Sequence, residues 1–220
     1  MPDKLRMRFS KTGRAVYISH LDLMRTMQRA FLRAGYPLKY SEGFNPHAQI
    51  SILLPLSVGC ASECELMDFQ LTEEVDLQEL PARLTAVMPE GVTVQEAYPA
   101  ETKAKLLKWL RVAGRYEYDR ADPAELAGKL AAFYAQETIV ITRKTKRGEG
   151  EMDIAPVVSE LHVRPLERFV ELEAVVSAQE PTLNPDHLVA ALRQRAPELA
   201  PDFAAFTRKE VYDAKMKIFR

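Results

Sequence analysis

The segment LRMRFSKTGRAVYISHLDLMRTMQRAFLRAG, at residues 5–35, decides how the fold begins. At its start, apolar Leu5, Met7 and Phe9 alternate with polar side chains up to residue 10. This alternation has the period of a half-buried strand, in which successive side chains point to opposite faces of a sheet. We therefore expect a strand over residues 5–10 with one apolar face and one cationic face.

An amphipathic helix is predicted within the same segment. Ser19 suits the N-cap, because Asp22 follows three residues later and resembles the acidic partner of a capping box. Gly35 is the residue type expected just after the last turn. Side chains at helical spacing predict the buried stripe of this helix, which consists of Leu21, Met24, either Met27 or Gln28, and Phe31.

Working outward, the rest of the first half supplies four more elements. Alternating or apolar runs predict strands at residues 48–56, 64–71 and 91–97. Residues 76–88 suit a helix that Pro81 interrupts early. The order is strand, helix, strand, strand, helix, strand.

The second half repeats this order more loosely. The elements expected there are strands at residues 109–119, 138–144, 168–176 and 206–214, with helices that begin at Asp122–Pro123 and near Asn184. The polar run KRGEGE at residues 146–151 predicts a hairpin tip, and a short apolar stretch follows at residues 154–163. No similarity between individual residues of the two halves supports the repeat, only the order of elements.

Both halves therefore predict the α+β class. The architecture that we expect is two ferredoxin-like (βαββαβ) antiparallel-sheet units, at residues 1–100 and 106–220. In such a unit the helices cover one face of the sheet, and the other face is free to dock a partner. Because this fold hosts many unrelated activities, function has to be argued from the residues on it.

The composition is that of an ordinary globular chain: 220 residues, 47% hydrophobic and 28% charged. No window reaches the roughly 18 apolar residues of a membrane-spanning helix, and the charged N-terminus is unlike a signal peptide, so we expect a cytoplasmic protein without a membrane partner. The net charge of −1 hides an asymmetry, because residues 1–50 carry +6 and residues 51–100 carry −8. A local basic patch is possible, although these unlike charges can also pair after folding.

Metals and cofactors are not predicted. Cys60 and Cys64 lie four residues apart with only His47 nearby, whereas a structural zinc site usually needs four ligands and an iron–sulfur cluster needs three or four thiolates. Reduced thiols are the default in the cytoplasm. The chain also lacks the glycine-rich nucleotide motifs, the HExxH zinc motif and the GxSxG nucleophile motif, so no self-sufficient enzyme is visible.

Three arginines suggest a binding surface on the first helix. Arg25, Arg29 and Arg33 are spaced four residues apart on one helix face, where like charges repel one another. Something outside the helix should compensate them. The acidic residues of segment 63–79 are one candidate, a polyanion such as RNA is a second, and an acidic protein partner is a third.

The cationic sheet face and the turn-rich segment YSEGFNPH at residues 40–47 extend this surface. Tyr36, Tyr40 and Phe44 flank the loop and could stack on a base, although Phe44 also suits a plug of the loop into its own core. The exposed mid-strand aromatics that RNA-binding sheets generally carry are not expected in the first half. The residues predicted to contact RNA are Arg6, Arg8, Arg25, Arg29, Arg33, Tyr40, Asn45, His47 and Gln49. This prediction requires that the arginines are not each paired with a carboxylate of the same chain.

Two histidines are the catalytic candidates. His20 lies in the first turn of the predicted helix, and His47 follows Asn45–Pro46. Either imidazole could act as a general base. A lone histidine is more often structural, and His47 also suits a hydrogen-bonded turn.

The phrases SHLDLMR (19–25), YSEGFNPH (40–47) and LPLSVG (54–59) resemble signature blocks of the bacterial radical-SAM-linked proteins of unknown function. RKTKRGEGEMDIAPVVSEL (143–161) resembles a weaker downstream block. This resemblance implies a radical SAM enzyme as partner, which would bring its own cluster-binding cysteines. The first block is also similar, more distantly, to the CRISPR repeat-processing endoribonucleases, which often use a histidine in metal-independent cleavage.

Three functions remain open. The favoured one is an accessory protein that binds structured RNA and presents it to a radical SAM enzyme, without catalysis of its own. The second is an adaptor that holds the enzyme without contacting RNA. The third is a metal-independent endoribonuclease with His20 or His47 as general base.

Overall fold

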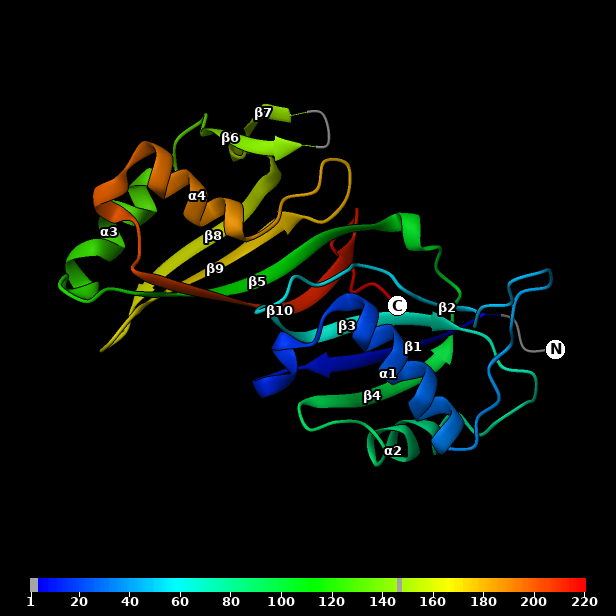
Figure 1. Ribbon diagram of the computed structural model, residues 1–220. Coiled ribbons are helices and arrows are strands. Elements are labelled where there is room, and N and C mark those ends of the chain that lie inside the picture. Colours follow the sequence, from blue (N-terminus) through cyan, green and yellow to red (C-terminus); the bar gives the residue numbers. More distant parts are fainter. Residues whose placement is uncertain (1–3, 146–147) are drawn as a thin grey trace. The chain divides into compact units, whose positions relative to one another are not determined.

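The structure is a computed structural model that describes residues 4–145 and 148–220. The chain separates into two compact units (Figure 1): unit 1 is Met1–Leu106 with Phe219–Arg220, and unit 2 is Leu107–Ile218. The described residues form four α-helices, and the strand pairs within each unit are antiparallel. The predicted α+β class is confirmed. The finer prediction of two ferredoxin-like units stays a prediction.

Unit 1 contains six elements. They are β1 (Leu5–Lys11), α1 (His20–Arg33), β2 (Ile50–Ile52), β3 (Ala61–Phe69), α2 (Leu80–Thr85) and β4 (Val92–Pro99). Strand β1 lies between β4 and β3, and the short β2 pairs with the other side of β3.

Helix α1 begins and ends where the sequence predicts. The Ser19 hydroxyl accepts a hydrogen bond from the Asp22 amide at 3.2 Å, and Gly35 adopts a φ of +77° after the last turn. The buried stripe differs from the prediction at its N-terminal end. Leu23 is buried there, whereas Leu21 is 66% exposed.

The core of unit 1 lies between α1, α2 and one face of the sheet. Leu5, Met7 and Phe9 of β1 pack in one cluster with Phe31 of α1 and Leu84 of α2. Both helices therefore cover the same sheet face, and the alternation in β1 assigns that face correctly. The opposite face carries Arg6, Arg8 and their cross-strand neighbours.

Strand β4 forms one edge of this sheet. Its register against β1 shifts between Arg8 and Phe9, which marks a bulge. The Thr85 hydroxyl of α2 accepts from the Val94 amide at 3.0 Å and lies 3.3 Å from the Val94 carbonyl, which it donates to. These are backbone groups of β4 that point away from β1, and Pro99 at the end of the strand has no amide hydrogen to offer.

Unit 2 contains eight elements. They are β5 (Leu107–Glu117), α3 (Pro123–Tyr134), β6 (Val140–Thr145), β7 (Gly148–Asp153), β8 (Val158–Pro165), β9 (Val170–Ser177), α4 (Asp186–Arg195) and β10 (Phe203–Asp213). The main sheet of this unit has the order β10–β5–β9–β8, and β6 pairs with β7 in a separate two-stranded sheet.

The separate hairpin corrects one prediction. Residues 138–144 were expected in the main sheet, but β6 pairs with β7 instead, and the neighbour of β9 is β8, from the apolar stretch at 154–163. In the predicted hairpin tip, Lys146 and Arg147 lie outside the described residues. The rest of the tip belongs to β7. Within the described residues, no helix is long and apolar enough to cross a membrane.

Candidate nucleic-acid interface

The arginine stripe of α1 is only partly neutralised within the chain. Arg25 donates to the Asp22 carboxylate at 3.1 Å, and Arg33 donates to the Val87 carbonyl at 2.7 Å. The Ser19 hydroxyl and then Arg25 lower the pKa of Asp22. Within residues 4–145 and 148–220, the exposed Arg29 side chain makes no hydrogen bond or ion pair. Arg29 is therefore available to an external anion.

Arg6 corrects the prediction of an open cationic sheet face. Its side chain is 1% exposed, and its Nε lies 2.6 Å from Oδ1 of Asp68, which is itself buried. Its Nη2 donates to the Thr102 carbonyl at 2.9 Å, and the Phe219 ring centroid lies 4.9 Å from its guanidinium carbon. The prediction that Arg6 points outward to RNA is wrong, because Phe219 and residue 102 cover this part of the face.

Arg8 lies on the same face and is half-buried. Its Nε donates to the Gln95 side-chain oxygen at 3.0 Å. Its cross-strand neighbour is Glu96, which accepts from Arg220 at 2.8 Å. An acidic side chain thus lies beside this cation, so Arg8 is a weaker anion ligand than Arg29.

The loop after α1 is held in a fixed turn. The Ser41 amide donates to the His47 carbonyl at 2.9 Å, and the His47 amide donates to the Ser41 hydroxyl at 3.1 Å. The same hydroxyl lies 2.8 Å from His47 Nδ1. Phe44 at the tip is 112% exposed, so it does not plug into the core, and Asn45 beside it is exposed too.

A surface pocket of about 390 Å³ joins this loop to α1. Its lining includes Gln28, Arg29, Leu32, Tyr36, Leu38 and Tyr40. Among the described residues no acidic side chain lines it, and Tyr40 is 52% exposed. The structure therefore brings Arg29 and Tyr40, predicted from different elements, to one site.

A second pocket, of about 220 Å³, holds His47 and Gln49 together with Lys4, Ser51 and Asp68. The Gln49 side-chain amide donates to the Tyr40 carbonyl at 3.5 Å, and Tyr40, which lines the first pocket, pairs with Ala48, which lines the second. The loop residues named from the sequence are thus gathered in one region of unit 1.

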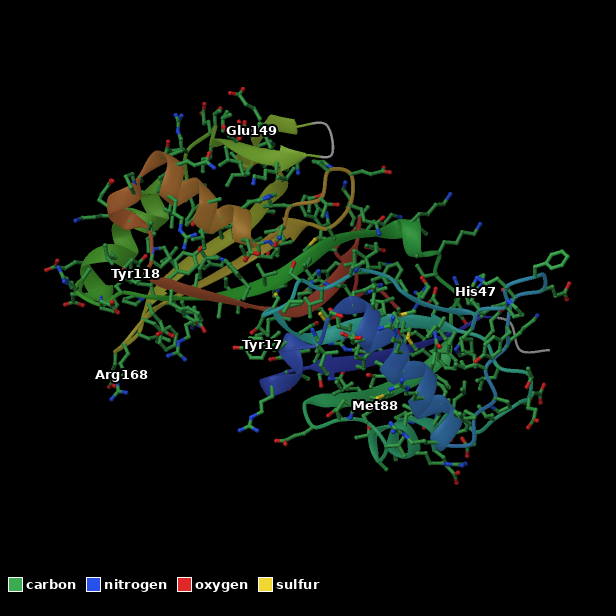
Figure 2. The ribbon with its side chains drawn as sticks, viewed as in Figure 1. Tyr17, His47, Met88, Tyr118, Glu149 and Arg168 are labelled. Carbon is green, nitrogen blue, oxygen red and sulfur yellow. The ribbon has the colours of Figure 1, made fainter. Side chains whose placement is uncertain are left out.

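The two candidate catalytic histidines do not form a pair. His20 is half-buried in the first turn of α1. Figure 2 shows Tyr17, three residues before it, and His47 at opposite sides of unit 1. Ser41 holds His47 Nδ1 in the turn, which is the structural role that the sequence left open.

Leu32 of the first pocket was missed by the sequence argument. It is 80% exposed although it directly follows the buried Phe31 of α1. Tyr36, named from the sequence as a ring that could stack on a base, is buried instead, and the Arg83 guanidinium lies over its ring at 4.7 Å while donating to the Ala34 carbonyl at 2.6 Å. The sequence did contain a signal for Leu32, because it is an apolar residue of the predicted helix that lies off the predicted buried stripe.

Unit 2 presents a sheet face whose arginines are paired. Arg111 lies 3.1 Å from Glu160 and from the Tyr212 hydroxyl, and Arg115 lies 2.7 Å from Glu117. The Tyr212 hydroxyl, as the main cause, raises the pKa of Arg111. Arg164 pairs with Glu171 in the same way. This face offers a polyanion little surplus charge.

Among the described residues, no group of three His, Cys, Asp or Glu side chains is placed to hold a metal ion. Cys60 is half-buried and Cys64 is buried, and neither forms a disulfide.

Comparisons with known proteins place the chain in a family. No curated protein matches it. Among solved structures, an unknown protein from Galdieria sulphuraria matches with 9% identity and a TM-score of 0.26, over 93% of this chain and 97% of the other. A TM-score this low carries no information about the fold. A family model described as "Uncharacterized protein conserved in bacteria (DUF2344)" matches residues 4–185. Because this match spans most of both units, the chain belongs to that family.

Proposed function

We propose that the protein is a cytoplasmic accessory protein of a radical SAM enzyme and that it binds structured RNA through α1 and the loop at residues 40–49. The observation that carries the RNA proposal is the pocket that both Arg29 and Tyr40 line, with no acidic side chain in its lining from the part of the chain that the structure describes. Proteins that recognise RNA by sequence or shape commonly hold an unpaired base on an aromatic ring and contact phosphates through arginine.

The geometry suits an unpaired base and its phosphate. Tyr40 offers a half-exposed ring, and Leu32 offers an apolar wall beside it. Stacking of a base on an aromatic side chain contributes about 1–3 kcal/mol. Arg29 at the same pocket supplies a charge for the adjoining phosphate, and Phe44 offers a second exposed ring on the same loop.

The strand order supports the inference that each unit is ferredoxin-like. In unit 1 the strands follow the order β4–β1–β3–β2, and in unit 2 the order is β10–β5–β9–β8. Both correspond to the fourth, first, third and second strands of a βαββαβ unit, with the hairpin β6–β7 as an insertion in unit 2.

The radical SAM partner rests on the resemblance of SHLDLMR (19–25) and YSEGFNPH (40–47) to the radical-SAM-linked blocks. In the structure these segments are α1 with its cap and the loop at residues 40–47. The same region of unit 1 would then meet both the RNA and the enzyme. The partner would supply the cluster, and this chain would supply a positioned substrate.

The test of RNA binding is the salt dependence of the Arg29→Ala variant. Fluorescence anisotropy with a stem–loop RNA should give weaker binding and a log–log salt slope shallower by about 0.7–0.9, which is the loss of one phosphate contact. Arg168→Ala is the matched control, because Arg168 is an exposed arginine of unit 2 (Figure 2). Equal affinities and slopes for both variants and the unaltered protein would refute the proposal.

A protein-only adaptor is the second candidate, favoured by one observation. Leu21, Leu32 and Phe44 are 66%, 80% and 112% exposed in unit 1. Apolar contacts survive salt, whereas phosphate contacts do not. Co-purification of the enzyme from a nuclease-treated, high-salt lysate, lost with Leu32→Asp but kept with Arg29→Ala, would favour the adaptor.

RNA cleavage by His20 or His47 remains a proposal that no contact described above favours. Total RNA incubated with the protein in EDTA should stay intact. Cleavage that disappears in a His20→Ala/His47→Ala variant would instead establish the endoribonuclease.

A further inference from the structure

Strand β6 packs beside helix α4 in unit 2 (Figure 1). The Gln194 side chain of α4 is hydrogen-bonded to both backbone groups of Thr142, at 2.8 Å from its amide and 2.9 Å from its carbonyl. His187 lies about two helical turns before Gln194, so both side chains are on the same face of α4. The face of α4 that meets the hairpin therefore carries an imidazole as well as an amide.

Arg143 approaches the same region from β6. Side chains two residues apart on a strand share a face, so Arg143 is on the side of β6 that also carries the buried Ile141. Arg143 is half-buried, and the residue opposite it on β7 is Gly150, which has no side chain to pair with it. The positive charge of Arg143 acts on the His187 ring.

Two buried nitrogen atoms in this region lack hydrogen-bond partners. Within residues 4–145 and 148–220, Nδ1 of His187 and Nε of Arg143 are buried without one. Nε of arginine can only donate, whereas Nδ1 of a neutral imidazole either accepts or donates. Protonation of the ring turns Nδ1 into an obligatory donor and adds a positive charge. Two donors and two like charges would then lie in one buried region, and both effects disfavour the docked arrangement.

The groups around His187 keep its ring neutral while the hairpin is docked. Burial first, and then Arg143, lower the pKa of His187 below its ordinary value of 6.5. Asp186, in the same turn of α4, raises it by a smaller effect. From α3, the Tyr134 hydroxyl donates to the Leu188 carbonyl and keeps its proton, since burial raises its pKa well above 10.0. The ring therefore takes up its proton only on acidification.

Opening of this contact would remove the penalty on the charged ring. Once the ring and the guanidinium are hydrated and apart, the pKa of His187 returns toward 6.5. As pH falls below this value, the open state binds the proton first, so the equilibrium moves toward opening. Ile141 and Met152 pair across the hairpin and are both buried, so they hold its other end against the unit.

We propose that the Arg143 end of the β6–β7 hairpin is an acid-sensitive latch on α4. Protonation of His187 places a second positive charge near Arg143 and releases this end from the helix, while Ile141 and Met152 keep the rest of the hairpin docked. The latch lies within unit 2 and does not depend on the function proposed for α1 and its loop.

The test is amide hydrogen exchange of the whole protein at several pH values, corrected for the intrinsic effect of pH on exchange. The Thr142 amide donates to Gln194, so it reports on the docked state. Its protection should fall by up to about tenfold between about pH 7 and about pH 5.5, since uptake of one proton shifts an equilibrium at most tenfold per pH unit. Amides of β5 and β9, in the main sheet, should keep their protection.

Two variants identify the groups of the latch. His187→Gln stays neutral at every pH, so the protection of the Thr142 amide should no longer fall on acidification. Arg143→Met removes the neighbouring charge and should reduce the fall without abolishing it, because burial of the ring still acts. His162→Gln is the matched control, since His162 is an exposed histidine of β8, and it should show the same fall as the unaltered protein.

Three results would overturn the proposal. Constant protection of the Thr142 amide down to about pH 5.5 would show that the hairpin has no acid-sensitive latch. An undiminished fall in both His187→Gln and Arg143→Met would assign the acid effect to other groups. Loss of protection in β5 and β9 together with Thr142 would show unfolding of the whole unit in place of local release. None of these results bears on the Arg29 test.

Discussion

At the scale of single residues, Asp68 is the shared counter-charge of two cations in unit 1. Its buried carboxylate accepts from Nε and Nη2 of Arg6, at 2.6 and 3.2 Å, and from Lys4 at 2.9 Å. Arg6 has nowhere else to place its charge, because only 1% of it reaches solvent. Breaking a buried pair from one side leaves an uncompensated charge, which costs far more than an exposed pair contributes.

Asp68→Asn should therefore destabilise unit 1 by about 3 kcal/mol. Urea denaturation followed by circular dichroism measures this loss. Asp22→Asn is the control, since the Asp22–Arg25 pair is exposed to solvent and screened, so its loss should change stability far less than the loss of the buried pair. Equal effects of the two substitutions would contradict the role assigned to Asp68.

Arg6 also shows where residue-level prediction stops. The alternation in β1 gives its facing correctly, since Met7 and Phe9 are buried against the helices and Arg6 is on the other face. Whether that face is open depends on Phe219, more than two hundred residues later. No local pattern contains this information. Arg29 was predictable because its exposure follows from the helix period alone.

At the scale of elements, the Gln194 side chain of α4 is hydrogen-bonded to the β6–β7 hairpin. The Gln194 amide accepts from the Thr142 amide at 2.8 Å and donates to the Thr142 carbonyl at 2.9 Å. It therefore takes the place of a neighbouring strand at this position. The alternation at residues 138–144 predicts a strand correctly but does not identify its partner, which is why the sequence placed it in the main sheet.

Gln194→Ala should loosen this hairpin without unfolding unit 2. Hydrogen exchange at the Thr142 amide should accelerate several-fold, because that donor loses its acceptor. Amides of β5 and β9, in the main sheet, should exchange as before. Unchanged exchange at Thr142 would show that β6 is held by other contacts.

Helix and strand lengths were predicted less well than their order. The strand expected over residues 48–56 is reduced to Ile50–Ile52, and the helix expected over 76–88 is reduced to Leu80–Thr85. Pro55 lies in the part of the first segment that is not a strand, and Pro81 occupies the first turn of α2. Proline limits both, because it lacks the amide that continues a ladder or a helix.

At the scale of whole units, several titratable groups of unit 2 predict how the stability of this unit depends on pH. Burial, followed by the neighbouring Tyr116, raises the pKa of Tyr134 well above 10.0. Burial also raises the pKa of Tyr118 to about 12. Burial, then Arg143, lowers the pKa of His187 below 6.5, against a smaller opposing effect of Asp186. Trp109 of β5, the only tryptophan, reports on this unit.

Stability of unit 2 should be level between about pH 6.5 and pH 10 and fall outside this range. Above the unfolded tyrosine pKa, the unfolded state loses protons first, so stability falls as pH rises. Below the unfolded histidine pKa, the unfolded state binds a proton first, so stability falls as pH drops. Trp109 fluorescence during urea unfolding at several pH values measures both limbs.

Two variants separate the limbs of this profile. Tyr134→Phe should weaken the alkaline dependence, and His187→Gln should weaken the acidic dependence. A profile that neither variant changes would assign the pH dependence to other groups.

The candidate site was predicted in its parts and not in its assembly. Arg29, Tyr40, His47 and Gln49 were all named from α1 and the loop. Their grouping around two pockets depends on how residues 36–40 return along α1, which spacing in the sequence does not specify.

The edge strand β4 has a consequence for the protein at high concentration. An uncovered strand edge is a template on which another chain can add, and fibrils grow by repetition of that step. Along β4 this template is interrupted, because Thr85 occupies the backbone groups of Val94, a bulge follows, and Pro99 lacks an amide hydrogen. Unit 1 is thus guarded at this edge against self-templated aggregation.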